Sequence, residues 1–500
     1  MYDLIFRARF GGDYLQHWSS LAALQSVTGS ALGQSWLYAG SLATSGYQRL
    51  ALQENTAAVW LGSTSLASGM NYRLSDVTAL NFGGQTRLLS TGLAQGAIDA
   101  QIVTATGSLQ GGQALSGLTG TVGAGFAALT SFAVAGQQFI AAAGAGTDDL
   151  RLFQLRNNWQ MTQTAVQYDT TKTTLGGVSD LISLRLGAHS FVVAASTTQD
   201  GLSSYQVDAA GHLELIDSIG ISEGLWVSGL DAVQSLSVVT ETYLISVSSR
   251  ASSLAVVRIN HLGVMFVSDL VYDTLDTRFA NSAQIATFSS AGRGFVLAGG
   301  SDGGLSLLEV LPSGVLYHHR SYEALSEWGL TNVIGLEVVQ VGNDWQVFVA
   351  GGTTPGLAQL SLSLAGLGAA QTGTAGADLL IGSAAADLLI GDAGNDTLQG
   401  GAGDDLLISG RGADDLTGGA GADTFVMTAT AERSVIRDFE KGVDLINLDD
   451  WGRIYDISTL LFETRSDGAS ISWQGLSLRV ESADHQPIDV TSWLATDFLF

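Results

Sequence analysis

Residues 373–426 read GTAGADLLI, GSAAADLLI, GDAGNDTLQ, GGAGDDLLI, SGRGADDLT and GGAGADTFV, which are six nine-residue repeats in unbroken phase. The sixth position is always Asp and the eighth is always apolar. Glycine at the turn positions permits backbone conformations that a β-carbon would forbid. This period predicts a parallel β-roll, in which short strands point apolar side chains inward and alternate with turns that carry Asp.

The spacing of the Asp residues predicts a cation. Two repeats complete one coil of 18 residues, so the aspartates stack in two columns on opposite sides of the roll. Successive coils lie about 4.8 Å apart, which is the usual strand spacing. Two carboxylates at that distance repel each other by roughly 3 kcal/mol at an effective dielectric of about 20. Calcium would reverse the sign of this interaction and also takes oxygen ligands from turn carbonyls, so we expect the roll to be ordered only with calcium.

The candidate calcium-binding residues are the repeat aspartates and the turn glycines. They are Asp378, Asp387, Asp396, Asp405, Asp414, Asp423, Gly373, Gly376, Gly382, Gly391, Gly394, Gly400, Gly401, Gly403, Gly410, Gly412, Gly418, Gly419 and Gly421. The four stacked Asp pairs permit up to four interior sites. Ala385 and Ser409 replace turn glycines, and the site between Asp387 and Asp405 is the one that the sequence supports least.

These repeats resemble the calcium-binding block of the RTX family, whose members are exported by type I secretion. The segment Val435–Leu448 is similar to the one that caps the roll in RTX proteases and lipases. The ending Asp497-Phe498-Leu499-Phe500 is typical of uncleaved type I export signals, and residues 1–9 lack the layout of a cleavable signal peptide. The resemblance implies Ca²⁺ as cofactor, the type I secretion machinery as partner, and a bacterial protein that is secreted, extracellular or at the cell surface.

The composition agrees with that expectation. The chain has no Cys, and Asp plus Glu exceed Lys plus Arg by 26. An acidic balance argues against nucleic-acid binding, which needs a basic surface. A hydropathy scan would flag residues 122–143, but Gln137 and Gln138 interrupt this stretch and it keeps the register of the longer repeat described next, so we predict no membrane span.

A second, longer repeat occupies the first 365 residues. Short apolar strands ending in small residues recur, with their third residues at 39, 90, 143, 195, 247, 298 and 350. The spacings are 51, 53, 52, 52, 51 and 52 residues, which is typical of propeller blades. The strands are Leu37–Gly40, Leu88–Thr91, Ala141–Gly144, Val193–Ser196, Ile245–Ser248, Val296–Gly299 and Phe348–Gly351.

Each unit contains four predicted strands; in the sixth they are residues 283–289, 294–299, 305–311 and 315–322. The seventh unit lacks its fourth strand, and the segment Leu4–Gly11 is placed to supply it and close the ring. The predicted chain is all-β. It comprises a seven-bladed β-propeller (1–365), a linker (366–372), the β-roll (373–426), and a C-terminal β cap with the secretion signal (427–500).

The function of the propeller is left open between two classes. Neither HExxH nor GxSxG occurs, and the seven histidines show no metal-ligand spacing. Five Asx residues precede predicted inner strands and could hold a cation near one channel mouth, or could cap their own turns: Asp76, Asp180, Asp231, Asn281 and Asn332. The absence of a catalytic constellation favours a binding or structural module, of an adhesin or surface-layer type that contacts a glycan or another surface ligand. The alternative is a hydrolase or lactonase with a metal in its channel.

Overall fold

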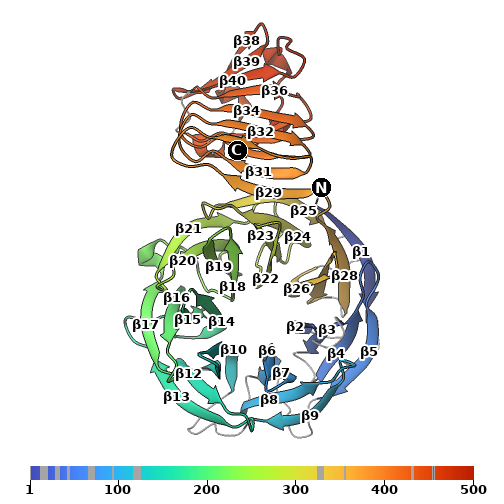
Figure 1. Ribbon diagram of the computed structural model, residues 1–500, viewed down its shortest axis with the longest axis vertical. Coiled ribbons are helices and arrows are strands. Elements are labelled where there is room, and N and C mark those ends of the chain that lie inside the picture. The colour runs from blue at the N-terminus through green and yellow to red at the C-terminus, as the bar shows by residue number, and fades with distance from the viewer. Residues whose placement is uncertain are drawn as a thin grey trace. The chain divides into compact units, whose positions relative to one another are not determined.

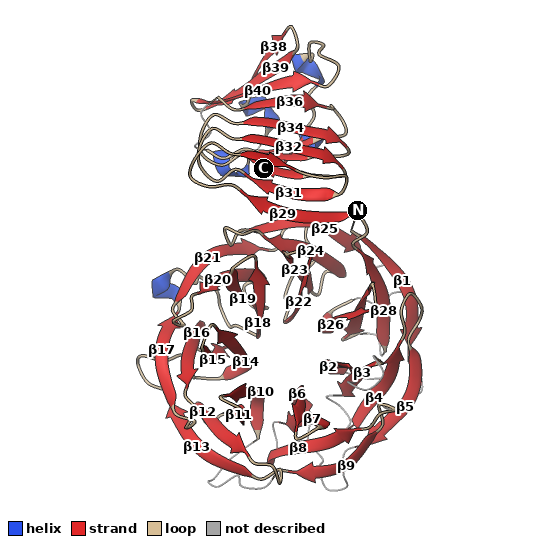
Figure 2. Ribbon diagram, in the orientation of Figure 1, coloured by secondary structure: helices blue, strands red, loops and turns tan. Residues whose placement is uncertain are grey.

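The computed structural model describes residues 2–11, 21–28, 34–41, 46–65, 74–92, 95–115, 125–323, 331–353, 356–429, 433–452, 454 and 456–499. The protein is all-β, as predicted, and its strands account for nearly all of the regular structure (Figure 2). Contacts divide the chain into two compact units, residues 3–290 with 294–363, and residues 364–500 with 1–2 and 291–293. Among the described residues no helix is long and apolar enough to cross a membrane.

The first unit is a seven-bladed β-propeller, and each blade is a four-stranded antiparallel sheet (Figure 1). The first three blades are β2 (Leu21–Thr28), β3 (Ser35–Ser41), β4 (Gly46–Leu52) and β5 (Val59–Ser65); β6 (Leu74–Phe82), β7 (Gln85–Gly92), β8 (Gln95–Val103) and β9 (Leu109–Ala114); and β10 (Phe126–Val134), β11 (Gln137–Gly144), β12 (Asp149–Leu155) and β13 (Met161–Tyr168). The described part of the stretch 122–143, from residue 125 on, therefore contributes to two antiparallel strands of blade 3.

Blades 4 to 6 repeat the pattern. They are β14 (Val178–Leu186), β15 (His189–Ser196), β16 (Gly201–Val207) and β17 (Leu213–Ile219); β18 (Ala232–Val238), β19 (Glu241–Ser248), β20 (Ser253–Ile259) and β21 (Met265–Tyr272); and β22 (Gln284–Ser290), β23 (Arg293–Gly299), β24 (Gly304–Val310) and β25 (Leu316–Glu323). A short 3-10 helix, η1 (Ile221–Glu223), lies between blades 4 and 5. The predicted strands of the sixth unit match β22–β25 to within one residue.

The two ends of the propeller sequence meet in blade 7. Its strands are β26 (Val333–Val341), β27 (Asp344–Gly351), β28 (Leu357–Ser363) and β1 (Asp3–Phe10). The N-terminal strand β1 pairs antiparallel with β28, from Asp3 opposite Ser363 to Phe10 opposite Leu357. The predicted ring closure is therefore confirmed, and β1 covers the edge that β28 would otherwise expose.

Neighbouring blades pack an aromatic ring under a glycine turn. In four places a ring on the second strand of one blade meets the turn between the third and fourth strands of the next: Trp36 with Gly107, Phe139 with Gly211, Phe191 with Gly263, and Tyr243 with Gly314. Between blades 2 and 3 the pair is replaced, because Arg87 occupies the ring position and Trp159 the turn, with the guanidinium 3.9 Å from the ring centroid. This cation–π contact still packs the two blades together, but the large ring now lies in the turn and the guanidinium on the strand.

Gly263→Ala is expected to destabilise the propeller more than a glycine substitution that meets no neighbour. Gly263 has φ +84°, and a β-carbon there would lie 2.4 Å from the Phe191 ring. Overpacking costs about 1–3 kcal/mol, in addition to about 1–2 kcal/mol for a left-handed backbone. Gly224 is the control, since it has φ +93° and no atom within 4 Å of a β-carbon placed there. Thermal melting measures both variants, and an equal loss would contradict the packing argument.

The second unit is built around a parallel β-roll with two sheets. One sheet runs β29 (Leu367–Thr372), β31 (Ala386–Ile390), β33 (Leu406–Ile408), β35 (Thr424–Val426), β37 (Leu445–Asn447) and β41 (Phe498–Leu499). The other runs β30 (Leu379–Ile381), β32 (Thr397–Ala402), β34 (Asp415–Ala420), β36 (Val435–Phe439), β40 (Leu476–Ser482), β39 (Gly468–Trp473) and β38 (Leu461–Arg465). Position-eight residues such as Leu389, Leu407 and Phe425 are fully buried between the sheets.

The roll is longer than the boundaries 373–426 that the repeats predict. Residues 366–372 are not a linker, because Leu367–Thr372 forms β29 and pairs in parallel with β31. Downstream, β36 and β37 continue the two sheets with parallel pairing to β34 and β35. The repeat signature requires Gly and Asp in each turn, so it misses coils that preserve only the strand. The parallel solenoid therefore covers residues 367–447.

The rest of the unit caps the roll. The antiparallel strands β38 to β40 extend one sheet, and the remaining 3-10 helices are η2 (Asp449–Trp451), η3 (Ile457–Thr459), η4 (Val490–Ser492) and η5 (Ala495–Asp497). Strand β41 pairs in parallel with β37, and Phe498 is buried in the same core as Phe425 and Trp493. The predicted export signal thus includes a strand of the folded roll, while Phe500 lies outside the described residues.

Candidate metal centre

The six repeat aspartates form two hydrogen-bonded columns. In the first four repeats the backbone N–H of the Asp donates to Oδ1 of the Asp one coil later: Asp378 to Asp396 at 2.8 Å, Asp387 to Asp405 at 2.7 Å, Asp396 to Asp414 at 3.0 Å and Asp405 to Asp423 at 2.9 Å. The separation of 18 residues is the coil period read from the sequence. In the four accepting carboxylates, Oδ1 is therefore bonded to the backbone. The surroundings of the second oxygen, Oδ2, differ from repeat to repeat.

Three of the second oxygens are buried without a hydrogen-bond partner. They are Oδ2 of Asp396, Asp405 and Asp423, whose residues are only 1%, 2% and 1% exposed. A buried carboxylate oxygen without a donor is costly unless a cation neutralises it. These atoms are hard, anionic and aimed into the turns, so they fit calcium as a ligand.

The glycine at position one makes room for these oxygens. A β-carbon on Gly400 would lie 2.3 Å from Oδ2 of Asp405, and one on Gly418 would lie 2.3 Å from Oδ2 of Asp423. The other position-one glycines, Gly373, Gly382 and Gly391, likewise lie against the carboxylate of their own repeat. Left-handed turn conformations are taken by Gly394, Gly401, Gly403, Gly410, Gly412, Gly419 and Gly421. Gly376 is less constrained, because only the Thr374 hydroxyl oxygen comes within 4 Å of a β-carbon placed there.

Burial shifts the titration of these carboxylates upward. Burial, together with neighbouring carboxylates, raises the pKa of Asp405 and of Asp423 to about 7. The pKa of Asp414 is raised to about 6 by the same causes, and that of Asp396 is raised as well. Each shift means that the metal-free roll holds its negative charges at a cost.

The columns continue past the last repeat through residues that the repeat pattern does not identify. Oδ1 of Asp444 accepts the N–H of Asp423, and Oγ of Ser434 accepts the N–H of Asp414. The intervals are 21 and 20 residues rather than 18, so a search for the nonapeptide stops before them. A weaker signal exists, because Asp444-Leu445-Ile446 repeats the Asp-apolar-apolar order of Asp387-Leu388-Leu389.

No group of three or more His, Asp or Glu side chains that could hold a metal ion occurs in the described part of the chain. A roll of this kind does not need one, since calcium can take most of its oxygens from turn carbonyls with one carboxylate from each coil. The residues present therefore fit calcium through the orphan oxygens and the surrounding backbone, rather than through a carboxylate cluster.

In the propeller, the side chains of Asp76, Asp180 and Asp231 accept backbone N–H groups, whereas the Asn281 side chain bonds a serine hydroxyl. Asp76 accepts the N–H groups of Val77 and of Leu129 in the next blade, at 2.7 and 2.8 Å. Asp180 does the same with Leu181 and Val233, at 2.8 and 2.9 Å. Both carboxylates thus bridge the inner strands of neighbouring blades. Asp231 accepts the N–H of Ser249 at 2.6 Å, Asn281 donates to Ser301 at 2.9 Å, and the carbonyl of Asn332 accepts the N–H of Gly352 at 2.7 Å. Leu129, Val233 and Ser249 lie outside the turns of the aspartates that they bind, so these bonds are not the local caps that the sequence suggested.

Two cavities occupy equivalent places between blades. One, of about 350 Å³, lies between blades 4 and 5; the other, of about 240 Å³, lies between blades 2 and 3. Their lining residues correspond at an interval of 104 residues, or two blades, as in Phe82 and Leu186 or Gln154 and Arg258. The larger cavity is lined by Arg185, Arg258 and His261 with Glu241. The smaller one has a single charged residue, Arg156, among amide side chains.

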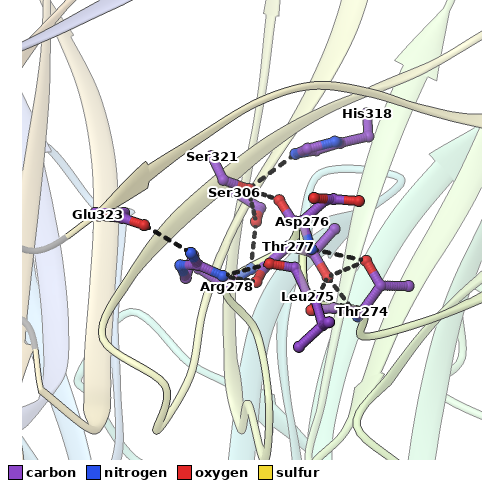
Figure 3. A network of polar contacts seen from close by, with 9 residues as sticks. All are labelled: Thr274, Leu275, Asp276, Thr277, Arg278, Ser306, His318, Ser321 and Glu323. Atoms are coloured by element: carbon purple, nitrogen blue, oxygen red, sulfur yellow. Dashed lines mark hydrogen bonds and ion pairs between the residues drawn. The ribbon is translucent and has the colours of Figure 1, made fainter. Parts of the chain in front are cut away.

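A serine–histidine contact in blade 6 belongs to a structural network (Figure 3). Nε2 of His318 lies 2.9 Å from Oγ of Ser321, but the Ser321 hydroxyl donates to the carbonyl oxygen of Asp276 at 2.6 Å. Its proton is therefore committed to the backbone, which leaves Oγ to accept from His318. The neighbouring contact of Ser321 with Ser306 recurs in blade 4 as Ser203 with Ser218, where no histidine takes part. This network fixes the connection between blades.

Comparison with known proteins identifies the roll. The family model of the RTX calcium-binding nonapeptide repeat matches residues 372–407 and 390–425. Residues 372–425 are therefore RTX calcium-binding repeats, and the cofactor of this block is Ca²⁺. A search of curated proteins found no match.

Solved structures are similar to parts of this chain. A chain of the Chaetomium thermophilum Polycomb Repressive Complex 2 bound to GSK126 is 11% identical over 73% of this chain and 99% of its own, with a TM-score of 0.51. A humanized mutant of that complex gives 11% identity, 73% and 98% coverage and a TM-score of 0.52. A candidate 6-phosphogluconolactonase from Bacteroides uniformis gives 13%, 63% and 88%, with a TM-score of 0.46. These likenesses concern the fold alone.

Proposed function

We propose that this chain is a secreted calcium-binding protein whose roll folds on calcium after type I export, and whose propeller is an extracellular binding module. The observation that carries the first part is the set of buried, partnerless carboxylate oxygens of Asp396, Asp405 and Asp423. Low cytosolic calcium would leave these charges repelling one another and keep the C-terminal region unfolded. Extracellular modules bind calcium at about 10⁻⁴–10⁻³ M, so the ion would order the roll outside the cell.

The place of the last strand supports this order of events. Phe498 is buried in the roll core and Lys441 lies 3.4 Å from the buried Asp497. A type I exporter that reads these residues must therefore read them before the roll folds. Folding would then hide the signal, which makes export directional.

An export assay tests this part of the proposal. Replacing Phe498-Leu499 by Gly-Gly in a host with a matching exporter should stop secretion. Ile446→Gly is the matched control, because it damages the same parallel strand pair from the β37 side and leaves the tail intact; that variant should still leave the cell. The proposal would be contradicted if the tail variant were still secreted while deletion of residues 1–11 stopped secretion.

For the propeller we propose an acidic extracellular glycan as ligand, bound in the cavity between blades 4 and 5. Arg185 and Arg258 line this cavity together, and Arg258 is only loosely paired with Glu241, at 3.8 Å. Arginine binds carboxylate and sulfate groups through planar pairs of N–H donors. Bacterial surface polysaccharides that carry such groups have the chemistry that this cavity would recognise.

Binding to immobilised polyuronate and to a neutral glucan tests the ligand class. The double variant Arg185→Ala/Arg258→Ala should lose polyuronate binding, whereas Arg156→Ala in the equivalent cavity of blades 2 and 3 should retain it. Equal binding of both polymers would refute the acidic-glycan assignment. Turnover of a lactone panel by the purified protein would instead favour the alternative function, an extracellular propeller hydrolase or lactonase.

A further inference from the structure

We infer that hydroxyl groups of Thr374 and Ser383, instead of calcium, satisfy the Asp carboxylates of the first two RTX repeats. The roll then binds calcium only at Asp396, Asp405 and Asp423. This inference rests on the proposed calcium-dependent function and assigns which of its candidate ligands carry it. Its basis is a difference among six repeats that share the same Asp.

In the first two repeats the second carboxylate oxygen already has two donors. Oδ2 of Asp378 accepts the N–H and the hydroxyl of Thr374 at 2.6 and 2.8 Å. Oδ2 of Asp387 accepts the N–H and the hydroxyl of Ser383 at the same two distances. A carboxylate oxygen offers two lone pairs in its plane, and both are used here. A cation would have to displace a charge-assisted bond before it could bind.

The two hydroxyl groups are fixed in the donor orientation. Oγ1 of Thr374 accepts the N–H of Gly376 at 3.2 Å, and Oγ of Ser383 accepts the N–H of Ala385 at 3.2 Å. Each oxygen is thus held from the backbone side while its proton points to the carboxylate. The remaining oxygen of Asp387, Oδ1, accepts the N–H of Ala369 at 2.9 Å, so the carboxylate of this buried residue is fully satisfied without a metal.

Position two has different chemistry in the repeats that keep an orphan oxygen. It is Asp392 before Asp396, Gly401 before Asp405, and Gly419 before Asp423. Glycine has no side-chain donor, and an ionised Asp accepts only. Asp392 also adds negative charge beside Asp396, which favours a cation there.

The fifth repeat is separated from these three by a hydroxyl group from a later coil. Ser409 stands where the other repeats have Gly, and Oδ2 of Asp414 lies 3.4 Å from the Ser434 hydroxyl. Orphan oxygens therefore occur only in the repeats with Gly at position one and no hydroxyl at position two. The hydroxyl groups of Thr374, Ser383 and Ser434 thus divide six similar repeats into three that take the ion and three that do not.

Calcium per full-length chain, counted by native mass spectrometry and by equilibrium dialysis, tests the division. The double variant Asp378→Asn/Asp387→Asn should bind as many ions as the unchanged protein, because neither carboxylate contributes a ligand. Asp405→Asn should lose bound calcium. Thr374→Gly/Ser383→Gly, which restores the residue of repeats four and six, should gain bound calcium by freeing both oxygens.

The outcomes separate this inference from the proposed function. A loss of ions in Asp378→Asn/Asp387→Asn equal to that in Asp405→Asn would overturn the division while calcium binding stands. An unchanged ion count in Thr374→Gly/Ser383→Gly would also overturn it, and this variant keeps every carboxylate. A chain that binds no calcium in any form would refute the proposed function itself.

Discussion

Excess chelator is expected to unfold the roll while leaving the propeller folded. Without the ion, the stacked carboxylates of residues 378–423 repel across coils, by roughly 3 kcal/mol per adjacent pair at an effective dielectric of about 20. Several such terms act against the burial of the apolar core between the two sheets. Circular dichroism and hydrogen exchange should therefore show loss of β-structure in residues 373–426 on chelation and its return with calcium.

Magnesium is the control ion for this experiment. It prefers a small octahedral shell and gives up its water reluctantly, so it should not restore the roll at the same concentration. The propeller strands, whose cores between blades lie in a separate unit, should keep their protection throughout. A C-terminal unit that remains fully ordered in chelator would show that the Asp columns are stable without a cation.

Lowering the pH is expected to stabilise the metal-free roll and to weaken its affinity for calcium. The folded pKa values of Asp405 and Asp423, about 7, lie above the usual value near 4. The folded metal-free state therefore holds more protons than the unfolded chain between these values, and its stability falls as pH rises through 7. Calcium must displace those protons, so its affinity falls as pH drops below 7. A metal-free roll that is equally unstable at pH 5 and pH 8 would contradict the shifts.

Both folds could be predicted from the sequence because both are built from repeats. Asp at position six and an apolar residue at position eight establish the coil period, and the small residues at 39, 90, 143, 195, 247, 298 and 350 establish the blades. Features that lie outside both repeat patterns were not predictable. The pairing of β29 with β31, and the place of Asp444 and Ser434 in the columns, follow from strand register without a motif.

The sequence predicts which aspartates line the calcium-binding block, but not which of them bind the ion. All six aspartates lie where the period places them, yet which carboxylate oxygens lack a donor depends on the hydroxyl groups at position two and on Ser434 in a later coil. Such a difference appears only when donors and acceptors are paired atom by atom. In the propeller, the sequence left open whether Asp76 and Asp180 face a cation or the backbone. The backbone N–H groups of Leu129 and Val233, which they accept, come from the next blade 53 residues later.

Removal of residues 1–11 is expected to open the propeller. Strand β1 supplies the outer strand of blade 7, and its residues pair with β28 from Leu357 to Ser363. Without it, β28 becomes an exposed edge with unpaired N–H and C=O groups, which promotes association with other chains. Phe10 also packs against the cluster between blades 7 and 1, so that contact is lost as well. The truncated protein should melt at a lower temperature and aggregate on concentration.

Removal of Met1 and Tyr2 alone is the matched control, because it leaves every paired residue of β1 in place. Light scattering and thermal melting separate the two truncations, and a synthetic peptide of residues 3–11 added to the longer truncation should recover part of the loss by filling the edge. If both truncated proteins have the same melting temperature as the full-length chain, β1 does not contribute to ring closure. Blades 1 to 6 draw all four strands from consecutive sequence, so the pairing of β1 with β28 joins the two ends of the propeller and acts together with the packing of blade 7 on blade 1.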